Sequence, residues 1–133
     1  MPSDKHIFIV DDHTSMRRAL RRLIEATPEL AVAGEAATAE AALAAPELDA
    51  ADLLLVDLNL PGMSGVDMTG ELHARQPDYP CVVVSAFWEP SIVESALQAG
   101  AGGFASKCRS DALIASLEQV LAGERDVVAV GDG

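Results

Sequence analysis

Three short segments of this chain consist only of apolar residues, and they restrict the possible fold more than any other feature of the sequence. They are Ile7–Val10, Leu53–Val56 and Cys81–Val84. A strand that is apolar on both faces needs a helical layer on each side, and a parallel sheet provides that environment. Two weaker segments, Ala31–Ala33 and Gly103–Ala105, are predicted to be further strands.

Segments with helical periodicity separate these strands. The predicted helices cover residues 15–26, 38–45, 64–77, 90–99 and 110–123. Residues 46–52 are predicted to be a connector, and Ser64 and Ser110 stand where an N-cap is expected. Strands that alternate with single helices form right-handed crossover units. We therefore predict an α/β fold with a doubly wound, five-stranded parallel sheet in the flavodoxin-like strand order 2-1-3-4-5.

The length of the chain fits one domain. Its 133 residues are about one domain long, and half of them are apolar, which is sufficient for a single core. We predict that this domain covers residues 1–123. Residues 124–133 have no helical pattern and are predicted to form a C-terminal tail or the start of a linker.

The charge of the chain limits its partners. With 9 Lys and Arg against 21 Asp and Glu, the net charge is −12. Nucleic-acid binding requires an excess of positive charge, so we expect no direct binding of DNA or RNA, and the acidity also disfavours anionic membranes. Only two cysteines are present, and no apolar run approaches the roughly 18 residues of a membrane span. We predict a reduced, cytoplasmic protein without a membrane segment.

Polar residues stand at or near the ends of four of the predicted strands. Asp11 and Asp12 follow the first, Asp57 the third, Ser85 the fourth and Lys107 the fifth. In a doubly wound sheet these strand ends meet at the ligand-binding edge. Two carboxylates about 4 Å apart repel by roughly 4 kcal/mol at an effective dielectric constant of 20, and a hard cation such as Mg²⁺ relieves that repulsion. A single Asp after a strand is usually a turn or cap residue, but three on neighbouring strand ends are hard to explain in that way.

Four motifs in order make the chain similar to a known family. They are Ile9–His13, Leu54–Gly65, Val82–Ala86 and Gly100–Lys107. With these motifs the sequence resembles the receiver domain of two-component response regulators, which has the CheY-like fold. Residues 32–36 and 112–124 resemble, in particular, receivers that precede a LuxR-type helix-turn-helix output domain.

The resemblance implies a Mg²⁺-dependent phosphoacceptor. Asp57 takes the position of the phosphoacceptor. Asp12 and Asp57 take the positions of direct Mg²⁺ ligands, together with the backbone carbonyl of Asn59, and Asp11 would act on the ion through water.

It also implies a switch. Ser85 takes the position that binds a phosphoryl oxygen, and Lys107 the position that pairs first with Asp57 and then with the phosphoryl group. Phe104 takes the position of the aromatic residue that turns inward when the Ser85 hydroxyl moves.

The implied partners are a sensor histidine kinase, a second copy of the chain after phosphorylation, and a C-terminal DNA-binding domain in a longer chain. The implied function is a signalling domain for transcription regulation that catalyses only its own phosphorylation and dephosphorylation, and is otherwise no enzyme. A stand-alone receiver that acts through protein contacts remains an alternative. A small aspartyl-nucleophile phosphatase is a weaker one, because its second acid would fall at Asn59.

A group of arginines lies on the first predicted helix: Arg17, Arg18, Arg21 and Arg22. Such a group is either a solvated helix face balanced by nearby acid or a docking surface for a partner. The sequence alone leaves both interpretations open.

Overall fold

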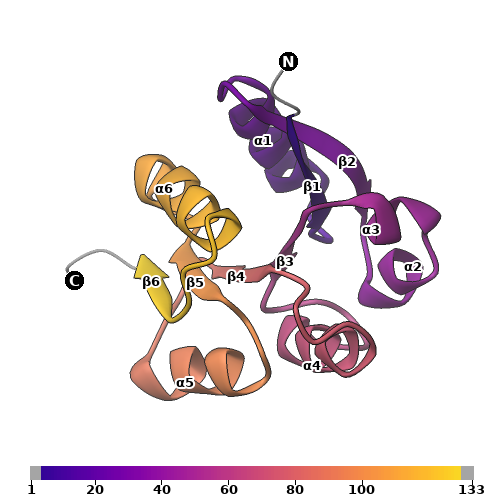
Figure 1. The fold of residues 1–133 in the computed structure, drawn as a ribbon. Coiled ribbons are helices and arrows are strands. Elements are labelled where there is room, and N and C mark those ends of the chain that lie inside the picture. Colours follow the sequence, from indigo (N-terminus) through magenta and orange to yellow (C-terminus); the bar gives the residue numbers. More distant parts are fainter. Residues whose placement is uncertain (1–3, 130–133) are drawn as a thin grey trace.

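The computed structural model describes residues 4–129, which form one parallel sheet of six strands with helices on both faces (Figure 1). The strands are β1 (Lys5–Val10), β2 (Leu30–Ala36), β3 (Leu53–Asp57), β4 (Cys81–Ser85), β5 (Gly103–Ser106) and β6 (Val127–Ala129). Their order is β2-β1-β3-β4-β5-β6, and each neighbouring pair is parallel. The predicted α/β class, the parallel sheet and the order of the first five strands are confirmed.

The prediction of exactly five strands is wrong, because β6 lies in the segment that was expected to be a tail or linker. The Val127 amide donates to the Gly102 carbonyl at 3.1 Å, and Gly103 pairs with Val127. Gly123 and Asp126, with φ of 100° and 57°, lie in the turn that follows α6 (Ser110–Leu121). Three residues are too few to show a periodicity, so only the free edge of β5 makes this segment a strand. Residues 130–133 of the predicted tail lie outside the described residues.

The helices divide into two layers. Besides α6 they are α1 (Thr14–Glu25), α2 (Ala39–Leu43), α3 (Pro46–Ala50), α4 (Gly65–Arg75) and α5 (Pro90–Gln98). Helices α1 and α6 cover one face of the sheet, and α2 to α5 cover the other (Figure 1). Within residues 4–129, no helix combines the length and the apolar character that a membrane crossing requires.

The two layers explain why the strand segments contain only apolar residues. In β1, Ile7 and Ile9 belong to the core under α1 and α6, whereas Phe8 and Val10 belong to the core on the opposite face. Each of these four side chains is at most 1% exposed. A polar residue at any of these positions would be buried, so charged residues of the central strands β1 and β3 stand at the strand ends.

Two local predictions need correction. The connector predicted for residues 46–52 contains the short helix α3, because Pro46 at its first position starts a helix that the preceding Ala-rich segment does not continue. The N-cap of α6 is Arg109 rather than Ser110, and its side chain makes no capping hydrogen bond. Ser64 caps α4 as predicted, since its hydroxyl accepts a hydrogen bond from the Asp67 amide at 3.0 Å.

Candidate functional site

The strand register brings the predicted polar residues to one edge of the sheet. Val10 of β1 pairs with Val56 of β3, so that Asp11 and Asp57 follow at the same level. Asp57 is itself paired with Val84 of β4, one residue before Ser85. Because parallel strands share one direction, the residue types that were separated in the sequence collect at their carboxyl ends.

Lys107 lies between two of the carboxylates. Its ammonium Nζ is 2.8 Å from Asp11 Oδ2 and 3.2 Å from Asp57 Oδ2. The Lys107 side chain is 8% exposed, and Asp11 and Asp57 are 0% and 3% exposed. The three groups therefore form a buried cluster with two negative charges and one positive charge, which we call the acid–lysine cluster.

Burial and charge act together on the pKa values of this cluster. Burial raises the pKa of the Asp57 carboxyl above its ordinary value, and the charge of Asp11 adds to this, although the Lys107 ammonium opposes it. For Lys107, burial favours the neutral amine, but its hydrogen bonds and charge interactions with Asp11 and Asp57 outweigh burial and raise its pKa. The cluster thus holds an excess of negative charge that the protein neutralises only in part.

The acidic residues fit a hard divalent cation. Four residues each place one possible metal-ligand atom here, and these atoms all lie within 4.8 Å of one another. The residues are Asp11, Asp12, His13 and Asp57. Asp12 Oδ1 is buried and accepts no hydrogen bond from residues 4–129. A buried carboxylate oxygen that accepts no hydrogen bond, beside two further carboxylates, suits Mg²⁺, which prefers oxygen ligands. Asn59, the other predicted ligand, lies just after β3, where its amide donates to Asp57 Oδ1 at 3.3 Å.

Ser85 and Phe104 are both buried next to this edge. Ser85 is the last residue of β4, is 1% exposed, and accepts a hydrogen bond from the Phe87 amide at 3.2 Å. Phe104 is 0% exposed, lies on β5 and pairs with Val83 of β4 and Val128 of β6. The predicted switch residues are therefore on adjacent strands, with the aromatic ring buried in the core under α5.

Three residues near the site were not predicted to take part in it. Ser106 is 5% exposed and accepts a hydrogen bond from the Cys108 amide, in the turn that presents Lys107. The His13 ring places Nδ1 3.5 Å from Asp11 Oδ1 and 3.3 Å from Asp12 Oδ1. The position of His13 directly after the two acids could have indicated a role in the site. Because Mg²⁺ prefers oxygen ligands, His13 was not predicted to be a ligand.

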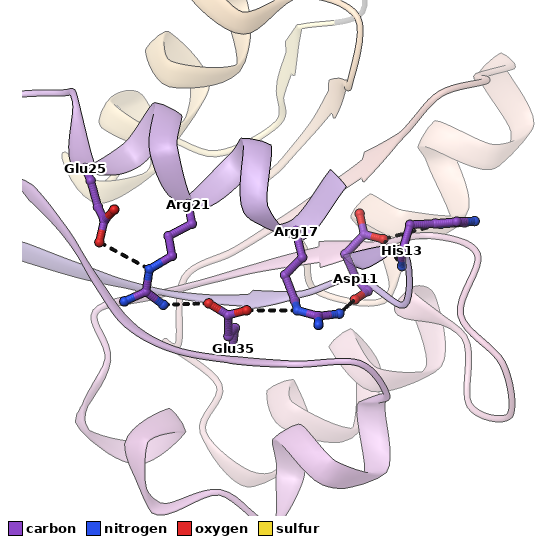
Figure 2. Close-up of polar contacts among 6 residues, drawn as sticks. All are labelled: Asp11, His13, Arg17, Arg21, Glu25 and Glu35. Carbon is purple, nitrogen blue, oxygen red and sulfur yellow. Dashed lines mark hydrogen bonds and ion pairs between the residues drawn. The ribbon is translucent and has the colours of Figure 1, made fainter. Parts of the chain in front are cut away.

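Arg17 is the third of these residues. Its Nη1 donates to the backbone carbonyl of Asp11 at 2.7 Å, and its Nε donates to Glu35 Oε1 at 2.9 Å (Figure 2). Arg21 binds the other oxygen of Glu35 and also Glu25, so the row of contacts continues along α1. Nearby acid thus balances the charge of these two arginines, as one of the two interpretations expects, but the contact with Asp11 had no signal in the sequence.

The chain is similar to proteins of known type. Residues 7–118 match the family described as the response regulator receiver domain. The chain is 35% identical to the DNA-binding transcriptional activator DevR/DosR of Mycobacterium tuberculosis over 101 residues, which cover 76% of this chain and 46% of that protein. It is 34% identical to the nitrate/nitrite response regulator protein NarL of Escherichia coli over 119 residues, which cover 89% of this chain and 55% of that protein. The chain thus spans about half the length of these curated relatives.

Solved structures agree with these relatives. A LuxR-family two-component response regulator from Aurantimonas sp. SI85-9A1 superposes with a TM-score of 0.88 at 32% identity, over 94% of this chain and 90% of that one. The signal receiver domain of the response regulator NarL from Mycobacterium tuberculosis, described as putative, superposes with a TM-score of 0.85 at 28% identity, over 92% of this chain and all of that one.

Proposed function

Since the chain belongs to the response regulator receiver domain family, whose members are signalling domains of two-component systems, we propose that Asp57 is the residue that accepts the phosphoryl group. The observation that carries this proposal is the acid–lysine cluster. Asp57 is the last residue of the central strand β3, and Lys107 Nζ lies 3.2 Å from its Oδ2. A carboxylate beside a fixed ammonium is suited to receive a phosphoryl group, because the ammonium neutralises charge on the transferred oxygens.

The proposed step is an in-line displacement. An Asp57 carboxylate oxygen attacks phosphorus, the bond from phosphorus to the donor atom breaks, and the electron pair leaves with the donor. The product is an acyl phosphate on Asp57. Its lability suits a reversible signal, and the added negative charge is the event to which the rest of the domain must respond.

Receiver domains bind Mg²⁺ at an acidic pocket, and the Asp cluster of this chain is consistent with that property. We assign Asp12, Asp57 and the backbone carbonyl of Asn59 as its direct ligands and Asp11 as a ligand through water. When bound, the ion supplies positive charge that offsets the carboxylates and the incoming phosphoryl group. The buried Asp12 Oδ1, which accepts no hydrogen bond, and the raised pKa of Asp57 both support the binding of a cation at this place.

Ser85 and Lys107 are the proposed sensors of the phosphoryl group. The Ser85 hydroxyl would donate a hydrogen bond to a phosphoryl oxygen; its present contact uses the oxygen as an acceptor from the Phe87 amide and leaves the hydroxyl hydrogen available. Lys107 would transfer one of its contacts from Asp57 to the phosphoryl group. Movement of Ser85 leaves space beside the neighbouring strand. Since the Phe104 ring is already 0% exposed, its proposed response is a shift within the core toward that space, rather than the inward turn from the surface that the resemblance implies.

The proposed partners follow from the family. A sensor histidine kinase is the proposed donor, in the cytoplasm, and a second copy of the chain is a proposed partner after phosphorylation. The relatives include a DNA-binding transcriptional activator, and the match covers only about half of their length, so we propose that a C-terminal DNA-binding domain receives the signal. The net charge of −12 supports the proposal that this domain itself does not bind DNA.

The alternatives receive less support. A stand-alone receiver shares the phosphorylation chemistry and differs only in the absence of the DNA-binding domain. An aspartyl-nucleophile phosphatase needs a second carboxylic acid two residues after the nucleophile, and Asn59 in that place cannot act as a general acid.

Phosphorylation by a small donor tests the proposal. Treatment with phosphoramidate and Mg²⁺ should add one phosphoryl group per wild-type chain, measured by mass spectrometry of the intact protein. Asp57→Asn should add none, and Asp12→Asn should be labelled slowly. Full labelling of the Asp57→Asn variant would show that another residue is the acceptor.

A further inference from the structure

Arg17 connects the strand end that carries the acid pair to the neighbouring strand. It lies in the first half of α1, and its side chain is 17% exposed. One guanidinium holds two acceptors at once, the Asp11 carbonyl at the end of β1 and the Glu35 carboxylate on β2 (Figure 2). The planar fork of arginine suits such a double contact, because several donors are fixed in one plane.

The Asp12 side chain depends on this backbone. Its Oδ1 is buried and accepts no hydrogen bond from the described part of the chain, and the polar group beside it is the largely exposed His13 ring, with Nδ1 at 3.3 Å. The peptide group between Asp11 and Asp12 sets the place and direction from which the Asp12 side chain leaves the backbone. Arg17 binds the carbonyl of this same peptide group, while the Asp11 amide on the other side donates to the Ala36 carbonyl at 3.1 Å.

From this geometry we infer that Arg17 is a positioning residue for the divalent-cation site: it fixes the Asp11–Asp12 peptide and thereby aims Asp12 at the ion. The inference rests on the proposed function of the acidic cluster as a Mg²⁺ site. Glu35 supports the same role, since it holds the guanidinium from the opposite side.

Charge and positioning predict opposite results for the loss of Arg17. Removing a positive charge near an acidic site strengthens the binding of a cation by charge alone. Loss of a group that orients a metal ligand weakens binding, typically by tenfold or more. Arg21 provides the matched control, because it lies on the same helix and also binds Glu35. Its other contact is with Glu25, whereas that of Arg17 is with the Asp11 carbonyl.

The experiment is a titration of the ¹⁵N-labelled protein with MgCl₂, followed by NMR. Arg17→Met should bind Mg²⁺ about tenfold more weakly than wild type. Arg21→Met should bind it as tightly as wild type or more tightly. Arg17→Lys keeps the positive charge but lacks the planar guanidinium, so this variant should also bind Mg²⁺ more weakly than wild type. It serves as the test if Arg17→Met does not fold. Wild-type affinity in a folded Arg17 variant would overturn the inference.

A second measurement separates positioning from a general loss of structure. In the phosphoramidate reaction, Arg17→Met should need about tenfold more Mg²⁺ for half-maximal rate, but should approach the wild-type rate at saturating Mg²⁺. A lower maximal rate with an unchanged Mg²⁺ requirement would contradict the inference. If instead wild type neither binds Mg²⁺ nor becomes labelled, the proposed function itself fails, and the two failures are thus distinguishable.

Discussion

Two groups of charged residues lie close together in this domain, and they differ in nearly every physical respect. The acid–lysine cluster is buried at the carboxyl end of the sheet and holds two carboxylates for one ammonium. The second group, which we call the Glu35 row, runs along α1 and β2 and alternates Arg17, Glu35, Arg21 and Glu25 (Figure 2). Its side chains are 17% to 50% exposed, and its charges balance.

The two groups change carboxyl pKa values in opposite directions. Burial raises the pKa of Asp57, and Lys107 does not fully compensate. Burial also acts to raise the pKa of Glu35, but hydrogen bonds from Arg21 and Arg17 outweigh it, and the pKa is lowered. The Glu35 row therefore stabilises the fold around the site, whereas the acid–lysine cluster retains an unfavourable charge. We propose that a cation offsets that charge, in the Mg²⁺ site assigned above.

The largest expected effect on stability comes from Lys107. Lys107→Met leaves two buried carboxylates without their ammonium, and should lower the free energy of unfolding by about 3 kcal/mol at pH 7 without Mg²⁺. Urea denaturation in EDTA measures the loss. Because the pKa of Lys107 is raised, its stabilising effect should be complete below pH 10.5 and disappear as the pH rises through its folded value. An unchanged stability would mean that the acid–lysine cluster is not buried in solution.

Asp57→Asn should change the free energy of unfolding in the opposite direction to Lys107→Met. Removing the excess negative charge should raise the free energy of unfolding by about 1 kcal/mol at pH 7 without Mg²⁺, even though labelling is lost. The raised pKa means that the folded state takes up the Asp57 proton more readily than the unfolded state. The gain should therefore vanish as the pH falls below 3.8. A destabilised variant at pH 7, measured in urea, would contradict the idea that the site stores unfavourable charge.

Glu35→Gln should lower the free energy of unfolding by about 1 kcal/mol at pH 7, since a charge-assisted contact to each of two arginines is weakened. The lowered pKa means that ionised Glu35 stabilises the fold above pH 4.5, and that this contribution is lost as the pH falls through the folded value. Unfolding curves of wild type and variant should thus converge in acid. If Glu35→Gln lowered the free energy of unfolding only at low pH, ionised Glu35 would not be the stabilising form, and the Glu35 row would not have the stabilising role assigned to it.

The smallest effect is expected at the outer end of the Glu35 row. Glu25→Gln removes an exposed contact with Arg21 on the same helix, and should cost about 0.3 kcal/mol, decreasing further in high salt. Thermal unfolding at low and high ionic strength measures this. A cost as large as that of Glu35→Gln would mean that position along the row does not matter.

Much of the site was predictable because it depends on strand ends. Asp11, Asp57, Ser85 and Lys107 each follow or end a strand that could be recognised from its apolar residues, and a parallel sheet brings such residues together in any register that aligns its strands. The contact between Arg17 and the Asp11 carbonyl was not predictable. It depends on the rotation of α1 against the sheet and on a backbone oxygen, neither of which has a residue pattern.

The sequence by itself determined the layered α/β fold, the order of the first five strands and the edge at which the charges collect. The physical reason is that a strand buried on both faces must consist of apolar residues, so that polar residues are found only at its ends. The tertiary structure alone decided that β6 extends the sheet, because a three-residue segment becomes a strand only beside an open edge. It also decided the burial of Lys107 between Asp11 and Asp57, and with it the direction in which each pKa moves, because desolvation depends on what surrounds a group rather than on its neighbours in the chain.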